Sequence, residues 1–166
     1  VGTYNLQRIS SDEMADVVWG LKRDGLCRIL CLQEVVPHMK EKLLGCFPSA
    51  ISDGEIMMIY PEEFHLVANT SFDFSQKDKP FLSWTFRTER GDFTVFTGKL
   101  QHGPFLRDVD ARFNTLRMLL RQLPKTPRIF ALDTNFVYKE EHDDINRILD
   151  RNYFGVTSHP EGTHDL

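Results

Sequence analysis

Apolar and polar residues alternate along the chain with two different periods, and each period predicts one kind of secondary structure. Residues 1–6 and 28–32 are short apolar stretches of strand length. Between them, Met14, Val17, Val18 and Leu21 follow the three-and-four spacing of one buried helix face. Ser10 stands before this helix as the N-cap of a capping-box sequence. The first part of the chain is therefore predicted to be a strand, a helix and a strand.

The middle of the chain is rich in strand-forming residues. After a short helix predicted over residues 37–44, stretches with strand composition are separated by proline, glycine and charged residues. The residues from Glu89 to Asp92 have the composition of a tight hairpin turn. The block is predicted to be antiparallel, with strands at residues 55–60, 64–70, 81–88 and 92–100.

The last part returns to alternating helices and strands. Asp108 is predicted to cap a third helix, which is followed by an apolar strand at 128–132 and a helix at 140–150. The third helix is predicted to bury one apolar stripe, made of Phe113, Leu116, Leu120 and Leu123. Strands alternate with helices at both ends of the chain, and a block of hairpins lies between. This order predicts an α/β fold of two mixed sheets covered by helices.

Composition limits the functions that this fold can have. The 166 residues are 41% hydrophobic, which is enough for one domain with its own core. A net charge of -4 excludes a domain that binds nucleic acid by overall basicity. Three cysteines without a C-x-x-C pair indicate free thiols in a reducing compartment, so we expect a nuclear or cytoplasmic protein. No apolar run has the length of a membrane span, and no membrane partner is expected.

Polar residues stand where the predicted strands end, which is where α/β proteins place their sites. Glu34 follows a buried strand and can hold a hard cation such as Mg²⁺. Asp133 and Asn135 are two residues apart, so they point to the same side of an extended segment. The Asp can activate a water molecule and the Asn amide can donate to a phosphoryl oxygen. Taken singly, each of these residues is more typical of a strand end or a turn.

The order of these residues resembles the endonuclease/exonuclease/phosphatase superfamily over essentially the whole chain. The motifs that carry the resemblance are Thr3-Tyr4-Asn5, Gln33-Glu34, Leu132-Asp133-Thr134-Asn135, in which Leu replaces a glycine, and Thr163-His164-Asp165-Leu166. Within the superfamily the chain looks most like the 5′-tyrosyl-DNA phosphodiesterases. The resemblance implies a four-layer α/β/β/α sandwich and one domain over residues 1–166 that lacks the family's final strands.

The resemblance also implies a metal-assisted hydrolysis of a phosphodiester. Glu34 would bind Mg²⁺ or Mn²⁺, and Asn5 would position the metal or a phosphate oxygen. Asp133 would activate the attacking water and Asn135 would stabilise the transition state. Asp165 corresponds to the residue that supports the catalytic histidine of the family. The expected substrate is a nucleic acid or a protein–nucleic-acid adduct, and we expect a monomer.

Other residues are expected to bind phosphate or depart from the family pattern. Lys99, in Thr97-Gly98-Lys99-Leu100, stands where many relatives have a histidine, and His102 and Arg112 follow it. We expect these three residues to bind phosphate. Gln7 replaces an acidic residue, and the family's terminal Ser-Asp-His is not found before Leu166. Two alternatives therefore stay open: activity on RNA, abasic DNA or a phosphoinositide, and a catalytically silent interaction domain.

Overall fold

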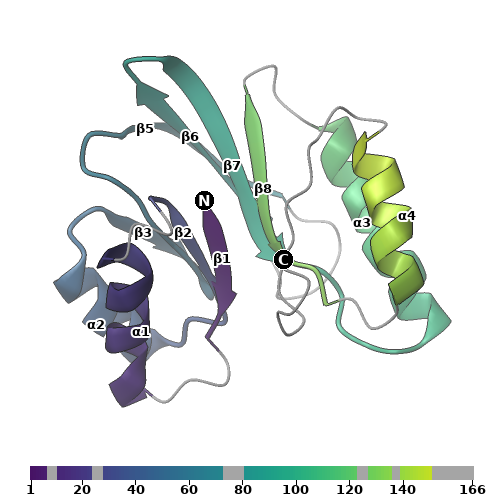
Figure 1. Ribbon diagram of the computed structural model, residues 1–166, viewed down its shortest axis with the longest axis horizontal. Helices are drawn as coiled ribbons and strands as arrows, with labels where there is room; N and C mark the ends of the chain where they lie inside the picture. Colours follow the sequence, from purple (N-terminus) through teal and green to yellow (C-terminus); the bar gives the residue numbers. More distant parts are fainter. Residues whose placement is uncertain (7–10, 24–27, 73–80, 123–126, 136–138, 151–166) are drawn as a thin grey trace.

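The chain folds into two four-stranded sheets in a computed structural model that describes residues 1–6, 11–23, 28–72, 81–122, 127–135 and 139–150. The chain begins with a strand, and helices lie between strands and after the last one (Figure 1). In chain order the elements are β1 (Gly2–Asn5), α1 (Ser11–Arg23), β2 (Leu30–Gln33), α2 (Pro37–Cys46), β3 (Ala50–Asp53), β4 (Ile56–Ile59), β5 (His65–Phe72), β6 (Phe81–Thr88), β7 (Gly91–Lys99), α3 (Leu106–Arg121), β8 (Arg128–Asp133) and α4 (Lys139–Asp150).

Each sheet contains one parallel pair of strands at the place where the two sheets meet. The first sheet has the order β1-β2-β4-β3 and the second β5-β6-β7-β8. The pairs β1–β2 and β7–β8 are parallel, and all other pairings in the described residues are antiparallel. Across the sandwich, β1 lies against β8 and β2 against β7. The carboxyl ends of these four strands therefore meet at one edge of the sandwich.

The period of two along each inner strand sends alternate side chains to opposite faces. On β2, Leu30 and Leu32 pack toward the helices, whereas Cys31 packs toward the second sheet. On β4, Met57 packs toward the helices and Met58 packs toward the second sheet. Both strands are buried on both faces, which explains why they are apolar apart from Gln33 at the end of β2. The core between the sheets consists of Ile29, Cys31, Ile56, Met58, Leu82, Trp84, Phe86, Val95 and Ala131.

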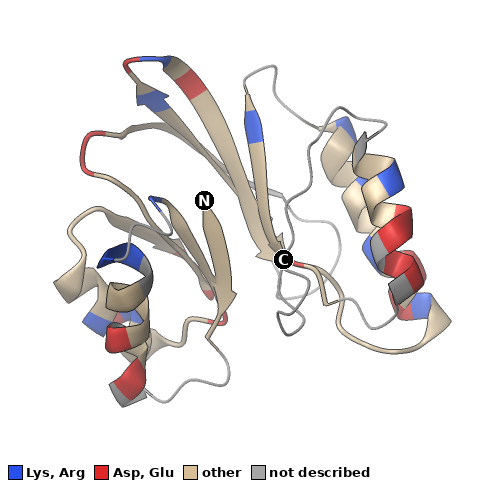
Figure 2. Cartoon of the chain, viewed as in Figure 1, with Lys and Arg blue, Asp and Glu red and all other residues tan. Residues whose placement is uncertain are grey.

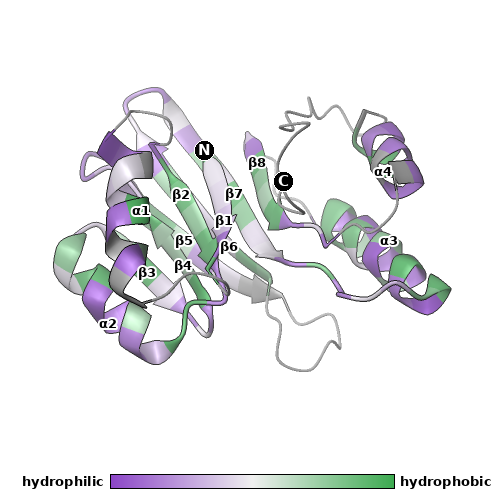
Figure 3. Ribbon diagram, turned by 60° about the horizontal axis from the view of Figure 1, so that its bottom comes forward, coloured by the Kyte–Doolittle hydropathy of each residue, from purple (hydrophilic) through white to green (hydrophobic). Residues whose placement is uncertain are grey.

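The helices cover the outer faces of the two sheets. The cluster of α1 and α2 with the first sheet includes Met14, Val18 and Leu43, and the cluster of α3 and α4 with the second sheet includes Leu116 and Ile145. Figures 1 and 3 show the resulting order of layers, helix, sheet, sheet and helix. The predicted α/β/β/α sandwich is confirmed. No helix in the described part of the chain is long and apolar enough to cross a membrane.

The β6–β7 hairpin confirms the predicted turn. Thr88 pairs with Gly91, so Glu89 and Arg90 alone form the connection. One step further from the turn, the guanidinium of Arg87 donates to both carboxylate oxygens of Asp92, at 2.9 and 3.0 Å. These hydrogen bonds lower the pKa of Asp92 below its usual value. The long hairpin is part of the second sheet, most of whose strand length is uncharged (Figure 2).

Two details of the secondary structure differ from the prediction. The helix α3 begins at Leu106, so Asp108 is not its N-cap. Asp108 lies in the first turn instead, and its carboxylate accepts a hydrogen bond from the backbone N–H of Phe105 at 3.2 Å. The strand β3 (Ala50–Asp53) was not predicted, because it has only four residues and they do not alternate between apolar and polar. Ser10 lies outside the described residues.

The buried face of α3 also differs from the predicted stripe. Its buried residues are Asp108, Arg112, Thr115, Leu116 and Leu119. Of the predicted residues, Leu116 is buried and Phe113 and Leu120 are partly buried, whereas Leu123 lies outside the described residues. The face is rotated toward Arg112 because a carboxylate on α4 neutralises this guanidinium in the interior.

Arg112 joins α3, α4 and the loop after β7. Its guanidinium is fully buried and donates through Nε and Nη2 to the carboxylate of Glu141, at 2.7 and 2.9 Å. Its Nη1 donates to the backbone carbonyls of Gln101 and Gly103, each at 2.9 Å. A buried charge of this kind is tolerated because partners occupy its N–H groups.

We expect Glu141→Leu to lower the free energy of unfolding by about 3–5 kcal/mol, because Arg112 then loses its carboxylate partner while buried. The double variant Arg112→Met/Glu141→Leu is expected to be more stable than Glu141→Leu, because it removes both charges. Urea unfolding measures all three proteins, and Glu140→Leu, at an exposed neighbouring position, is the control. A Glu141→Leu variant as stable as this control would contradict the assigned role of Arg112.

Candidate functional site

Six of the predicted site residues lie at the edge where β1, β2, β7 and β8 end. Asn5, Lys99 and Asp133 are the last residues of β1, β7 and β8, and Glu34 directly follows β2. Within the second sheet, the parallel register places Lys99 opposite Asp133. The pairing of strands from both ends of the sequence thus builds one cluster of polar side chains.

Asp133 is held from two sides. Its Oδ2 accepts a hydrogen bond from the Nδ2 of Asn5 at 2.8 Å, across the two sheets. Its Oδ1 accepts a hydrogen bond from the backbone N–H of Asn135 at 3.2 Å. The residue is almost completely buried. Both oxygens are engaged, and the carboxylate is therefore fixed in one orientation.

Lys99 lies between two carboxylates. Its ammonium contacts the carboxylate of Glu34 and lies 3.6 Å from Oδ2 of Asp133. The side chains of Lys99, Glu34 and Asp133 are 13%, 17% and 2% exposed, so solvent screens their charges only in part. One ammonium and two carboxylates have a formal net charge of -1, which leaves the cluster negative.

Two residues of the cluster have a backbone conformation that is uncommon outside glycine. Glu34 has a φ of 58° and Asn135 a φ of 49°. Such left-handed conformations of non-glycine residues are often found at functional sites, where the surrounding structure compensates their cost. Glu34 directly follows β2 and Asn135 is the second residue after β8, and both side chains belong to the polar cluster.

Asn135 and His102 extend the cluster toward solvent. The Nδ2 of Asn135 donates to the carbonyl of Leu100 at 2.8 Å, which turns its Oδ1 toward Nδ1 of His102 at 3.3 Å. An amide oxygen can only accept, so Nδ1 of His102 is the donor. The other ring nitrogen, Nε2, is then the atom through which this exposed side chain can contact a ligand.

A buried hydrogen-bond bridge lies next to the cluster. Gln33 directly precedes Glu34. The Nε2 of Gln33 donates to the hydroxyl oxygen of Thr3 on β1, at 2.8 Å, and to that of Thr97 on β7, at 3.0 Å. The bridge ties the first sheet to the second just before the strands end. Gln33 and Thr97 are not among the predicted site residues. A polar residue within an otherwise apolar strand is the signal that could have identified Gln33.

The donor set fits one hard divalent cation better than a zinc ion. In the part of the chain that the structure describes, no group of three or more His, Cys, Asp and Glu side chains could hold a metal. Zinc sites need several such ligands, whereas Mg²⁺ is often held by one or two carboxylates with water completing its shell. The position of Lys99 also indicates that the place between Glu34 and Asp133 attracts positive charge.

Two predicted site residues are not in the cluster. The prediction that Arg112 binds phosphate is wrong, because its guanidinium is fully buried and bound to Glu141 and to two carbonyls. Asp165 lies outside the described residues.

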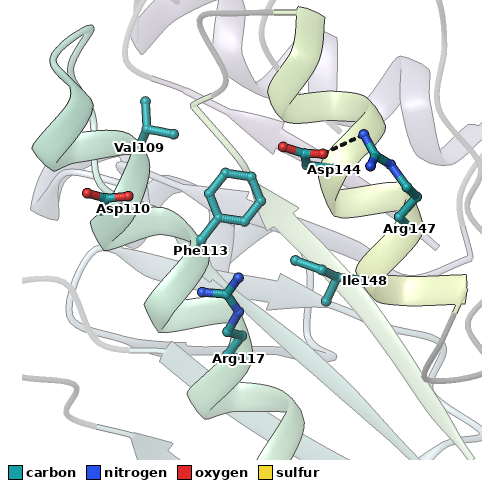
Figure 4. A pocket seen from close by; sticks show the side chains of 7 residues that line it. All are labelled: Val109, Asp110, Phe113, Arg117, Asp144, Arg147 and Ile148. Atoms are coloured by element: carbon teal, nitrogen blue, oxygen red, sulfur yellow. Dashed lines mark ion pairs between the residues drawn. The ribbon is translucent and has the colours of Figure 1, made fainter.

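A cavity of about 430 Å³ lies elsewhere, between α3 and α4 (Figure 4). An ion pair between Asp144 and Arg147, at 2.6 Å, is part of its wall. No residue of the polar cluster lines this cavity, whose lining consists of Val109, Asp110, Phe113, Arg117, Asp144, Arg147 and Ile148.

Comparison with known sequences gives no match, either to a protein-family model or to a curated protein. Solved structures do match. D. rerio TDP2 complexed with a single-strand DNA product has a TM-score of 0.69 at 18% identity, covering 87% of this chain and 63% of that chain. A mannosyl-6-phosphatase of Bacteroides thetaiotaomicron has a TM-score of 0.64 at 15% identity, covering 87% of this chain and 69% of that chain.

An endonuclease/exonuclease/phosphatase family protein of Bacteroides thetaiotaomicron has a TM-score of 0.62 at 16% identity, covering 80% of this chain and 62% of that chain. The present chain thus spans less than two thirds of the D. rerio TDP2 chain and of this family protein. The chain has the fold of the endonuclease/exonuclease/phosphatase family, which is the family that its strand-end motifs resemble.

Proposed function

We propose that this chain is a metal-dependent phosphodiesterase that acts on nucleic acid. The observation that carries the proposal is the fixed carboxylate of Asp133, which lies beside a place for a cation at the edge where four strands end. The fold supports a phosphoester substrate, because solved structures with this fold include TDP2 and a mannosyl-6-phosphatase.

Glu34 would hold the metal, which is Mg²⁺ or Mn²⁺. When bound, the ion supplies Lewis-acid polarisation and neutralises the charge of the phosphate. Some added positive charge is needed, because Glu34, Asp133 and Lys99 together leave the cluster negative and would repel a phosphodiester.

Asp133 accepts the proton of the attacking water as a general base. The new bond forms between the water oxygen and phosphorus while the bond to the leaving oxygen breaks. Asn5 is a positioning residue, because its Nδ2 fixes the orientation of the Asp133 carboxylate. Lys99 provides a contact for the phosphate oxygens, and His102 does so when its Nε2 also carries a proton. Asn135 orients His102 through Nδ1.

Exposed side chains in the segment that follows His102 favour nucleic acid over a smaller phosphoester. Phe105, three residues after His102, is 62% exposed. The guanidinium of Arg107 lies 5.2 Å from the centre of its ring. An aromatic ring with a cation beside it can stack on a base of a single strand. A TDP2 structure that contains a single-strand DNA product is consistent with such a substrate. A 5′-tyrosyl adduct of DNA or RNA is our specific candidate.

Hydrolysis assays test the proposal directly. We expect a 5′-tyrosyl oligonucleotide to be cleaved in Mg²⁺ faster than abasic duplex, poly(A), inositol phosphate or mannose 6-phosphate. EDTA and Glu34→Gln should each remove most of the activity, since the metal then has no site. Activity that survives both changes would refute the metal-dependent mechanism. No hydrolysis of any substrate would favour the second candidate, a catalytically silent domain, for which the contact between Lys99 and Glu34 is the supporting observation.

The general base and its positioning residue give a separate test. Asp133→Asn should lower kcat by about 10²–10⁴-fold, the usual contribution of a positioned base. Asn5→Ala should lower kcat less, and it should have little further effect in the Asp133→Asn background, because Asn5 acts through Asp133. Asp110→Asn changes an exposed carboxylate on α3 and is the control. Fully additive effects of the two substitutions would contradict the assigned pairing.

The contact with bases can be tested by comparing substrates of two sizes. Phe105→Ala should raise KM for the oligonucleotide about tenfold, as expected for the loss of one stacked base. It should leave bis(p-nitrophenyl) phosphate hydrolysis unchanged, because that substrate has no base. Phe105→Tyr keeps the ring and should behave like the wild type. An equal loss on both substrates would show that Phe105 supports the fold instead.

A further inference from the structure

The side chain of Lys99, at the end of β7, is buried to an extent that is unusual for a lysine. A lysine in such a position normally extends its ammonium into solvent. Here the side chain is only 13% exposed and its ammonium contacts Glu34, with Asp133 at 3.6 Å. The residue before it is also constrained: a Cβ on Gly98 would lie 2.5 Å from the ring of Phe81. This close approach fixes β7 where it brings Lys99 to the two carboxylates.

We propose that Lys99 is a built-in competitor of the metal, so that a divalent cation binds only by displacing its ammonium from Glu34. The inference rests on the proposed function for the identity of the cation. A monovalent ammonium and a divalent ion repel each other strongly when both lie against the same carboxylates in a partly buried cluster. The carboxylate of Glu34 therefore serves one of them at a time.

The charges of the cluster explain why the Lys99 ammonium and a divalent ion can replace each other at Glu34. With Lys99 in place, Glu34 and Asp133 retain one uncompensated negative charge, which attracts a metal. With a divalent ion in place, the two carboxylates are neutralised and the ammonium has lost its partner. The flexible four-carbon stem of lysine lets the ammonium turn away. The ammonium can then bind a phosphate of the substrate. Lys99 therefore occupies the metal site before the metal binds and contacts the substrate afterwards.

Binding of Mn²⁺ tests this without any turnover, by the electron paramagnetic resonance signal of the free ion. Lys99→Met should bind Mn²⁺ on the order of tenfold more tightly than the wild type or more, because the competing charge is gone. Lys99→Arg keeps a cation and should bind as weakly as the wild type. Lys40→Met is the matched control, since the ammonium of Lys40 contacts the carbonyl of Gly54 on the surface. Glu34→Gln should abolish the gain of Lys99→Met.

Thermal unfolding gives a second readout. In EDTA, Lys99→Met should melt below the wild type, because two carboxylates then lack a cation, and Mn²⁺ should raise its melting temperature more than that of the wild type. If this variant is unfolded in EDTA, Mn²⁺ should refold it, and failure to fold in millimolar Mn²⁺ overturns the proposal.

Equal Mn²⁺ affinity of Lys99→Met and the wild type also overturns the proposal, as does an equal gain in Lys40→Met. These results are separate from the failure of the proposed function. Absence of hydrolysis in every protein would refute the phosphodiesterase, whereas tighter Mn²⁺ binding by Lys99→Met would still show that the lysine competes for the place beside Glu34.

Discussion

The hydrogen bond from Gln33 to Thr97 is the contact that aligns the two sheets where their strands end. Apolar packing between the sheets has no direction and permits small shifts along the strands. A buried amide that must reach a hydroxyl on the opposite sheet permits far less movement. Because Glu34 follows Gln33 and Lys99 lies two residues beyond Thr97, this bond also sets how the charged residues of the two sheets meet. The bond from Asn5 to Asp133 completes the alignment.

The charges at this edge have to be balanced in a place that is mostly shielded from water. A unit charge pair near 4 Å is worth about 4 kcal/mol at the effective dielectric constant of a protein surface. Lys99 interacts favourably with both Glu34 and Asp133, whereas these two carboxylates repel each other. A cluster of this composition is stable only with a cation in it. Both the stability of the folded state and the proposed reaction therefore depend on a cation beside the two carboxylates.

The sequence was sufficient for the layers of the fold and for the strand ends at which the polar residues lie, because strand period and strand termination are local properties. It was not sufficient for contacts between distant segments. Nothing near Lys99 in the sequence indicates that its ammonium meets Glu34. Arg112 was misplaced for the same reason: its burial depends on Glu141, a carboxylate on another helix. The strand Ala50–Asp53 was missed because pairing with β4, and not its own composition, makes it a strand.

The residues on either side of His102 are held in place by contacts within the folded protein. Arg112 holds the carbonyls of Gln101 and Gly103, and Gly103, at a φ of 139°, lies so close to Asp108 that a Cβ there would be 2.2 Å from its carboxylate. The conformational entropy of this loop is therefore lost before any ligand arrives. A ligand that contacts the imidazole of His102 meets a backbone already in place, and more of its contact energy is available as affinity.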